Sequence, residues 1–258
     1  MGMSVDGPPR ALAPPHPPGR SGVGRMAPAL RGYVRRMKTP ARPVVVLDLD
    51  GTLVDSVYQH VVSWQAAFHD VGLHVSSVRI HEAIGMGGDR LVAAVAGDSA
   101  EHAVGDEVRR LHDTYFRTGL RTICPLDGAP ELVDALVDRG HRVVLASSSE
   151  AALVDDLLDI VGIGHRLHAV VTGSDEAASK PSPDLVALAV ERGGGGSGVV
   201  IGDATWDVES AVAAGLESIG LRSGGVSAER LLAAGAAAVH DGPRDLLEHL
   251  DAGLLGTA

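Results

Sequence analysis

The stretch Val44-Val45-Val46-Leu47-Asp48-Leu49-Asp50-Gly51-Thr52 decides the fold of this chain. Its first four residues form a short continuous apolar run, which is typical of a strand buried on both faces of a parallel sheet. Two carboxylates and a Gly-Thr turn follow at once. Ligands of open parallel sheets bind beyond the carboxyl ends of the strands. The stretch therefore predicts a buried strand that ends at a polar site.

Further apolar runs follow along the chain, and amphipathic segments separate them. The runs cover residues 142–146, 169–172, 198–201, 218–221 and 236–239. The helices that we expect between and after them span about 128–139, 150–161, 182–192, 206–214, 227–234 and 243–251. Strands that alternate with helices predict an α/β fold, a Rossmann-like parallel sheet covered on both faces.

Residues 57–122 interrupt this alternation because they contain no strong strand run. They predict helices over about 57–71, 76–83, 88–96 and 100–118. The segment is too long for a simple crossover between two strands. We therefore expect a helical cap domain at 57–122, inserted into a core domain formed by 43–56 and 123–258.

The first 42 residues differ in composition from the rest of the chain. They are rich in Pro and Gly and hold eight basic residues against one acidic residue, so we expect a disordered basic tail. The remaining residues hold 14 basic and 32 acidic side chains, within a net charge of −11 for the whole chain. This acidic body argues against binding to a nucleic-acid backbone.

Two further features limit the class of protein. The longest apolar runs fall well short of the roughly 18–20 residues that a membrane span needs, so we expect no membrane partner. The single cysteine, Cys124, excludes an internal disulfide and a multi-cysteine metal site, and it suits a cytoplasmic protein. Composition leaves the oligomeric state open.

Polar side chains follow four of the expected strands, and parallel topology brings them to one edge of the sheet. They are Asp48, Asp50, Ser147, Ser148, Lys180, Asp203 and Asp207. The carboxylates Asp48 and Asp203 would repel each other unless a cation lay between them. Hard oxygen ligands with open positions suit Mg²⁺, which is the cofactor that we expect.

Each residue type has a chemical use at such a site. A carboxylate such as Asp48 can attack phosphorus, and Asp50 can protonate a leaving alkoxide and then deprotonate water. Gly51 and Thr52 can turn their backbone N–H groups toward phosphate oxygens. The hydroxyl and the backbone N–H of Ser147 are further candidate phosphate donors, with Ser148 beside them. Lys180 can stabilise the transferring phosphoryl group.

The stretch 48–56, Asp-Leu-Asp-Gly-Thr-Leu-Val-Asp-Ser, resembles the first motif of the haloacid dehalogenase superfamily of phosphohydrolases. Ser147, Lys180 and Gly202-Asp203 with Asp207 are similar to its second, third and fourth motifs, in the same order. The resemblance implies a nucleophile and metal ligand at Asp48, a general acid/base at Asp50, whose main-chain carbonyl also binds Mg²⁺, and a metal ligand at Asp203. It also implies that Asp207 is the second acid of the fourth motif. Such an acid binds the metal directly, binds it through a water molecule, or holds Lys180.

The resemblance also narrows the reaction. Dehalogenases of the superfamily lack an acid two residues after the nucleophile, whereas this chain has Asp50. Phosphonate-cleaving members use a cap lysine, and 57–122 contains none. The expected activity is a Mg²⁺-dependent phosphatase that hydrolyses a small phosphorylated metabolite through an aspartyl-phosphate. A phosphosugar mutase stays open as the alternative, and a non-catalytic binding or regulatory protein is a third hypothesis.

Within the expected cap, Gly85-Met86-Gly87-Gly88-Asp89-Arg90 is the candidate segment for substrate recognition. Its glycines permit close approach of the backbone, and Arg90 can meet a second anionic group. An ordinary turn between two helices explains the same residues. We expect His60 and the other cap histidines to be surface or core residues, and we assign no role to Trp206.

Overall fold

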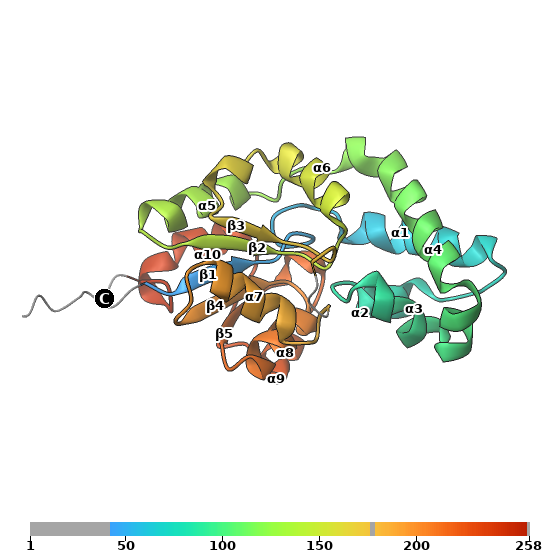
Figure 1. Ribbon diagram of the computed structural model, residues 1–258. Coiled ribbons are helices and arrows are strands. Elements are labelled where there is room, and N and C mark those ends of the chain that lie inside the picture. Colours follow the sequence, from blue (N-terminus) through green and yellow to red (C-terminus); the bar gives the residue numbers. More distant parts are fainter. Residues whose placement is uncertain (1–41, 176–178, 257–258) are drawn as a thin grey trace, which may run out of the picture. The chain divides into compact units, whose positions relative to one another are not determined.

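The computed structural model describes residues 42–175 and 179–256. The expected disordered tail lies outside the described residues, apart from Arg42. A six-stranded parallel sheet forms the centre of the fold (Figure 1). Its strands are β1 (Val44–Leu47), β2 (Val143–Ala146), β3 (Ala169–Val171), β4 (Gly198–Gly202), β5 (Glu217–Leu221) and β6 (Ala238–His240).

The strand order is β3-β2-β1-β4-β5-β6, which places β1 between two neighbours. Val45 pairs with Val143 of β2 on one side and with Val199 of β4 on the other. The order of the strands reverses at β1, and such a reversal opens a crevice at the carboxyl ends of the strands. The α/β fold with a Rossmann-like parallel sheet is confirmed.

Helices cover both faces of the sheet because the side chains of each strand alternate between two apolar cores. Val45 and Leu47 pack in one core, and Val44 and Val46 pack in the other. The first core includes α5 (Ala129–Asp138), α6 (Ala151–Val161) and α10 (Pro243–Glu248). The other face carries α7 (Asp184–Arg192), α8 (Thr205–Ala213) and α9 (Ala228–Ala234).

The segment after β1 is helical, as its sequence predicts. It forms α1 (Val57–Asp70), α2 (Ser77–Ala83), α3 (Gly88–Ala96) and α4 (Asp98–Gly119) (Figure 1). These helices share an apolar core of their own, which includes Trp64, Phe68, Ile80 and Val92. We call these four helices the cap.

Two stretches of chain join the cap to the sheet domain, and they pair with each other. Val54 and Pro125 form an antiparallel bridge. The backbone N–H of Asp55 donates to Cys124 O at 3.0 Å, and that of Leu126 donates to Leu53 O at 3.0 Å. The two linkers therefore leave the sheet domain side by side. In residues 42–175 and 179–256, no helix has the length and apolarity needed to cross a membrane.

Candidate active site

Asp48 follows the last residue of β1 and lies at the bottom of a cavity of about 400 Å³. Its backbone N–H donates to Ile201 O at 2.9 Å, which extends the pairing of β1 with β4 by one residue. The buried ammonium of Lys180 pairs with the Asp48 carboxylate and, at 2.6 Å, with Asp207 Oδ1. The structure thus brings together residues from three of the four predicted motifs.

The carboxylate of Asp203 completes the acidic group. It is 3% exposed, and the hydroxyl of Thr52 donates to its Oδ1 at 3.0 Å. Two glycines make room for its Oδ2. A Cβ atom on Gly51 would lie 2.4 Å from this oxygen, and one on Gly224 would lie 1.7 Å from it. Gly51 also has a φ of +78°, which favours glycine.

The backbone N–H groups that we expected to face phosphate are used elsewhere. That of Gly51 donates to Val54 O at 2.8 Å, and that of Thr52 donates to Leu49 O at 3.2 Å, because the turn closes on itself. The N–H of Ser147 donates to Val171 O at 3.0 Å and extends the parallel ladder. Ser147 therefore offers its buried hydroxyl to a ligand, and Thr52 holds Asp203.

Asp50 lies beside the cavity and accepts hydrogen bonds on both carboxylate oxygens. Its Oδ1 is 2.5 Å from Ser56 Oγ and 3.0 Å from His60 Nε2, and its Oδ2 is 3.4 Å from Ser149 Oγ. Burial opposes ionisation, yet His60 and Ser56 outweigh it and lower the pKa of Asp50. The carboxyl group is held in its ionised form.

His60 is a site residue that the sequence interpretation missed. Its Nδ1 lies 3.0 Å from Nε2 of His112 in α4, so the two imidazoles and Asp50 form one hydrogen-bonded chain. His112 stacks on Trp64 with 4.0 Å between ring centres, and burial holds its pKa well below 6.5. The available signal was the spacing of Ser56 and His60, which places both on one face at the start of α1.

The acidic group carries more negative charge than Lys180 compensates. Burial raises the pKa of Asp48 to about 7, although Lys180 opposes the change. Burial and the neighbouring Asp48 also raise the pKa of Asp203 well above its usual range. Burial alone would lower the pKa of Lys180, but Asp207 and Asp48 raise it.

Carboxylate oxygens of Asp48, Asp203 and Asp207 lie within 4.8 Å of one another, all on buried residues. Three carboxylates with a single ammonium are a donor set that fits a hard divalent cation such as Mg²⁺. Asp48 and Asp203 are the residues that would hold it, because each engages one carboxylate oxygen with a neighbouring side chain, whereas Asp207 engages both of its oxygens. Its Oδ1 pairs with Lys180, and its Oδ2 accepts from Ala204 N–H at 3.1 Å.

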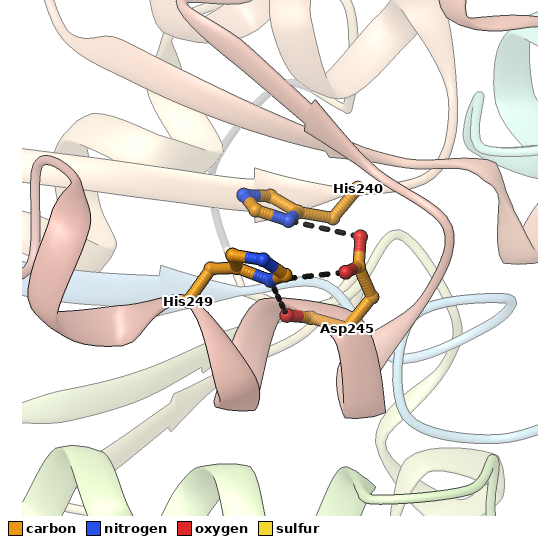
Figure 2. A group of neighbouring side chains, drawn as sticks. All are labelled: His240, Asp245 and His249. Atoms are coloured by element: carbon orange, nitrogen blue, oxygen red, sulfur yellow. Dashed lines mark hydrogen bonds and ion pairs between the residues drawn. The ribbon is translucent and has the colours of Figure 1, made fainter.

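A second group of possible metal ligands consists of His240 on β6, Asp245 in α10 and His249, the residue after α10 (Figure 2). Both oxygens of its carboxylate are already bonded. His249 Nδ1 is 3.0 Å from Oδ1, and Oδ2 accepts from Asp241 N–H at 3.0 Å and contacts His240 Nδ1 at 3.1 Å. These bonds tie the edge strand to the helix that follows it, which is a structural role.

The predicted recognition segment contacts the sheet domain closely. A Cβ atom on Gly85 would lie 2.8 Å from Ala204 Cβ, and Ser179 Oγ donates to Asp89 Oδ1 at 2.6 Å. The hydroxyl of Ser148 points to Gly85 O at 3.4 Å and lines the cavity.

Arg90 does not lie where a contact with a second anionic group of the substrate would require. Its side chain is 42% exposed, lies 4.0 Å from the Asp89 carboxylate, and does not line the cavity.

Two further contacts connect the cap to the sheet domain. The indole N–H of Trp206 donates to Glu82 O at 3.0 Å, and His81 Nε2 lies 2.9 Å from Gly224 O. Trp206 therefore has a contact role that its sequence did not indicate. These bonds hold the cap against the start of α8, which carries Asp207, and against the segment after β5, which carries Gly224.

Comparison with known proteins agrees with this geometry. Residues 43–215 match the family model described as haloacid dehalogenase-like hydrolase. The N-acetylmuramic acid 6-phosphate phosphatase of Pseudomonas aeruginosa is 29% identical over 86% of this chain and 99% of its own length. A plasmid-borne phosphoglycolate phosphatase of Cupriavidus necator is 30% identical over 67% of this chain and 77% of its own.

A solved structure of a hydrolase from Pseudomonas syringae has the same fold. It is 31% identical to this chain, with a TM-score of 0.78, over 81% of this chain and 98% of its own. The resemblance that the motifs indicated is confirmed. The chain belongs to the family of haloacid dehalogenase-like hydrolases and is a phosphoric monoester hydrolase.

Proposed function

We propose that this protein is a Mg²⁺-dependent phosphatase that hydrolyses a small phosphorylated metabolite through a phosphorylated Asp48. One observation carries the proposal. Lys180 pairs with both Asp48 and Asp207, and Asp48 lines a cavity together with Asp50 and Ser147. The relatives from Pseudomonas aeruginosa and Cupriavidus necator support the same class of substrate, because both are named as phosphatases of a small phosphate ester.

The chain's own residues account for the first half of the reaction. A carboxylate oxygen of Asp48 attacks phosphorus, and the bond between phosphorus and the alcohol oxygen breaks. Lys180 contacts the attacking carboxylate and stabilises the negative charge of the transferring group. The hydroxyl of Ser147 can donate to a phosphoryl oxygen. Bound Mg²⁺, held by Asp48 and Asp203, would supply charge stabilisation to the same group.

Asp50 moves the protons of both steps. It donates a proton to the departing alkoxide, and it then takes one from the water that attacks phosphorus and releases phosphate from Asp48. The low pKa that His60 and Ser56 give to Asp50 suits the second step. The first step needs a protonated Asp50, so bound substrate has to weaken the hold of these two partners.

Phosphate release from a panel of small phosphate esters tests the proposal, with Mg²⁺ and with EDTA. Asp48→Asn should abolish the release, whereas Asp55→Asn, an exposed acid in the linker, should retain it. Acid quenching followed by mass spectrometry should find one added phosphoryl group on the peptide that contains Asp48. Release by Asp48→Asn at the wild-type rate would refute the mechanism. Isomerisation of a sugar phosphate without phosphate release would indicate the mutase instead.

A further inference from the structure

The cavity beside Asp48 is where the alcohol part of a substrate must lie, if the proposed function holds. Its volume of about 400 Å³ is in the range of small-molecule sites. Asp48, Asp50 and Ser147 line the end that would hold phosphate. Helices α1, α3 and α4 and the turn at Gly85 and Met86 line much of the remainder, together with residues of the sheet domain such as Glu150 and Ser179, so the cap residues face the alcohol.

The charged side chains of this cavity are mostly acidic. Over residues 42–175 and 179–256, its lining outside the catalytic end includes one arginine, Arg109, and no lysine. The acidic side chains there are Asp89, Glu101, Asp113 and Glu150. Glu101 is the least exposed of them, with 23% of its side chain exposed, whereas Asp89, Asp113 and Glu150 are more exposed and Asp113 also pairs with Arg117. A carboxylate on the alcohol would therefore be repelled mainly by Glu101, because charges of like sign repel more strongly where water is partly excluded.

Both terminal nitrogens of the Arg109 guanidinium are already engaged by neighbours. Its guanidinium forms a two-point pair with Glu101, with N–O distances of 3.0 and 2.9 Å. Nη1 also donates to Gly88 O at 3.0 Å, and Nη2 donates to Asp106 Oδ1 at 2.7 Å. Two carboxylates therefore outweigh the single positive charge. A substrate carboxylate would have to displace Glu101 to reach it, and such a two-point pair is strong and directional.

The rest of the cap lining is apolar or neutral. Trp64, Ile84, Met86 and Leu91 face the cavity. His112 also lines it and is uncharged, because burial holds its pKa well below 6.5. Apolar side chains beside acidic oxygens suit an alcohol that carries C–H surface and hydroxyl donors. Carboxylate oxygens accept such hydrogen bonds, and the apolar groups cover the C–H surface.

We propose that the alcohol released by this enzyme is a neutral polyol or sugar, and that esters whose alcohol carries a carboxylate are poor substrates. The inference rests on the proposed function, because that function places the phosphate at Asp48. It differs from the activities for which both relatives described above are named, because N-acetylmuramic acid and glycolate each carry a carboxylate. The pair of Glu101 with Arg109 sets the preference.

Matched pairs of esters test the inference. Sorbitol 6-phosphate is compared with 6-phosphogluconate, and glycerol 3-phosphate with 3-phosphoglycerate, so that the members of each pair differ by a hydroxymethyl group in place of the carboxylate. Each ester is measured with Mg²⁺ as a substrate and as a competitive inhibitor of p-nitrophenyl phosphate hydrolysis. We expect the neutral member to be favoured at least about tenfold in kcat/KM or in Ki, as repulsion of a little over 1 kcal/mol requires. Equal kcat/KM and Ki values for the two members of each pair, or a preference for the carboxylate member, would overturn this inference but not the proposed phosphatase function.

A failure of the proposed function would look different. In that case no phosphate would be released from p-nitrophenyl phosphate or from any of the four esters, and the inference would fall with it. Hydrolysis of p-nitrophenyl phosphate with a preference for the carboxylate members would leave the phosphatase standing and refute only the inference.

Variants of α4 test the source of the preference. Glu101→Gln keeps the size of the side chain but releases the charge of Arg109, so it should narrow the ratio between the two members of each pair at least about threefold. Asp113→Asn, which removes another acidic group of the lining, should narrow it in the same direction. Glu107→Gln is the matched control, because Glu107 pairs with Arg110 and does not line the cavity. An unchanged ratio in both test variants would overturn the assigned role.

Discussion

His60 Nε2 lies 3.0 Å from Oδ1 of Asp50, so a helix of the cap holds the carboxyl group proposed as the general acid and base. The residue comes from α1, the first helix after the linker, and Phe116 of α4 stacks on its ring at 3.9 Å. The orientation of the Asp50 carboxyl group therefore depends on the position of the cap. Movement of the cap away from the sheet domain would remove this partner from Asp50.

Replacement of His60 tests this relationship. We expect His60→Gln to lower kcat by roughly 10- to 100-fold, with a smaller change in KM. This loss is part of the roughly 10²- to 10⁴-fold rate acceleration that a well-positioned general acid or base contributes. Because His60 lowers the pKa of Asp50, the acidic limb of the pH profile should also move to higher pH in the variant. His102→Gln, a histidine of α4 that does not line the cavity, is the control. An unchanged profile would assign His60 to packing alone.

The hydroxyl of Thr52 orients Asp203, so its removal should weaken the binding of metal. Thr52→Val keeps the shape of the buried side chain but deletes the bond to Asp203 Oδ1. We expect the Mg²⁺ concentration for half-maximal activity to rise about tenfold, the low end of the effect for partners of metal ligands. Titration of activity with Mg²⁺ measures it. Thr114→Val, the same change on an exposed residue of α4, should leave the titration unchanged.

Stability of the metal-free protein should depend on pH through Asp48. Its pKa is raised from 3.8 to about 7, so the folded chain keeps a proton that the unfolded chain loses in this interval. The free energy of unfolding contributed by this group therefore falls as pH rises from about 4 to 7. Asp48→Asn removes the titration. We expect its gain in Tm over the wild type to be larger at about pH 8 than at about pH 5.

Thermal unfolding in EDTA measures this difference, and Asp55→Asn serves as the control for the loss of an exposed carboxylate. Addition of Mg²⁺ should raise the Tm of the wild type more than that of Asp48→Asn, because binding to the folded state alone stabilises it. A gain in Tm that is the same at both pH values would contradict the assignment.

Gly85 tests the contact between the cap and the sheet domain. Its φ is +96°, and a Cβ atom would lie 2.8 Å from Ala204 Cβ, so Gly85→Ala should push the cap away from Ala204. We expect kcat/KM to fall about tenfold or more, as a displacement near 1 Å can cost up to 10²-fold. Gly72→Ala has a similar φ, +79°, in the cap but meets open space. Both variants carry backbone strain, and only Gly85→Ala should lose activity.

The sheet and the cap could be predicted from local patterns. The runs at 44–47 and near β2, β3 and β4 are apolar and rich in valine, and those near β5 and β6 are weaker, yet the predicted strands differ from the observed ones only at their ends. Helix α4 likewise begins at Asp98 rather than near residue 100. Motif spacing also predicted which polar residues gather at the carboxyl ends of the strands.

Contacts that depend on tertiary packing could not be predicted. Nothing local shows that the turn after Asp50 would use the N–H groups of Gly51 and Thr52 for itself. The role of His60 depends on how α1 meets Asp50, and that of Gly224 depends on a loop far along the chain reaching Asp203. Arg90 looked suitable by residue type, but the start of α3 directs it away from the cavity.

The paired linkers at Val54 and Pro125 have a consequence for evolution. Because the inserted helices begin and end at adjacent points, they can be exchanged as a cassette while the sheet keeps its reaction. Asp48, Lys180 and Asp203 stand outside the cassette, whereas Arg109 and Glu101 lie inside it. The proposed chemistry and the proposed substrate preference thus depend on separate parts of one chain and can change independently, except at His60, through which the cassette contacts Asp50.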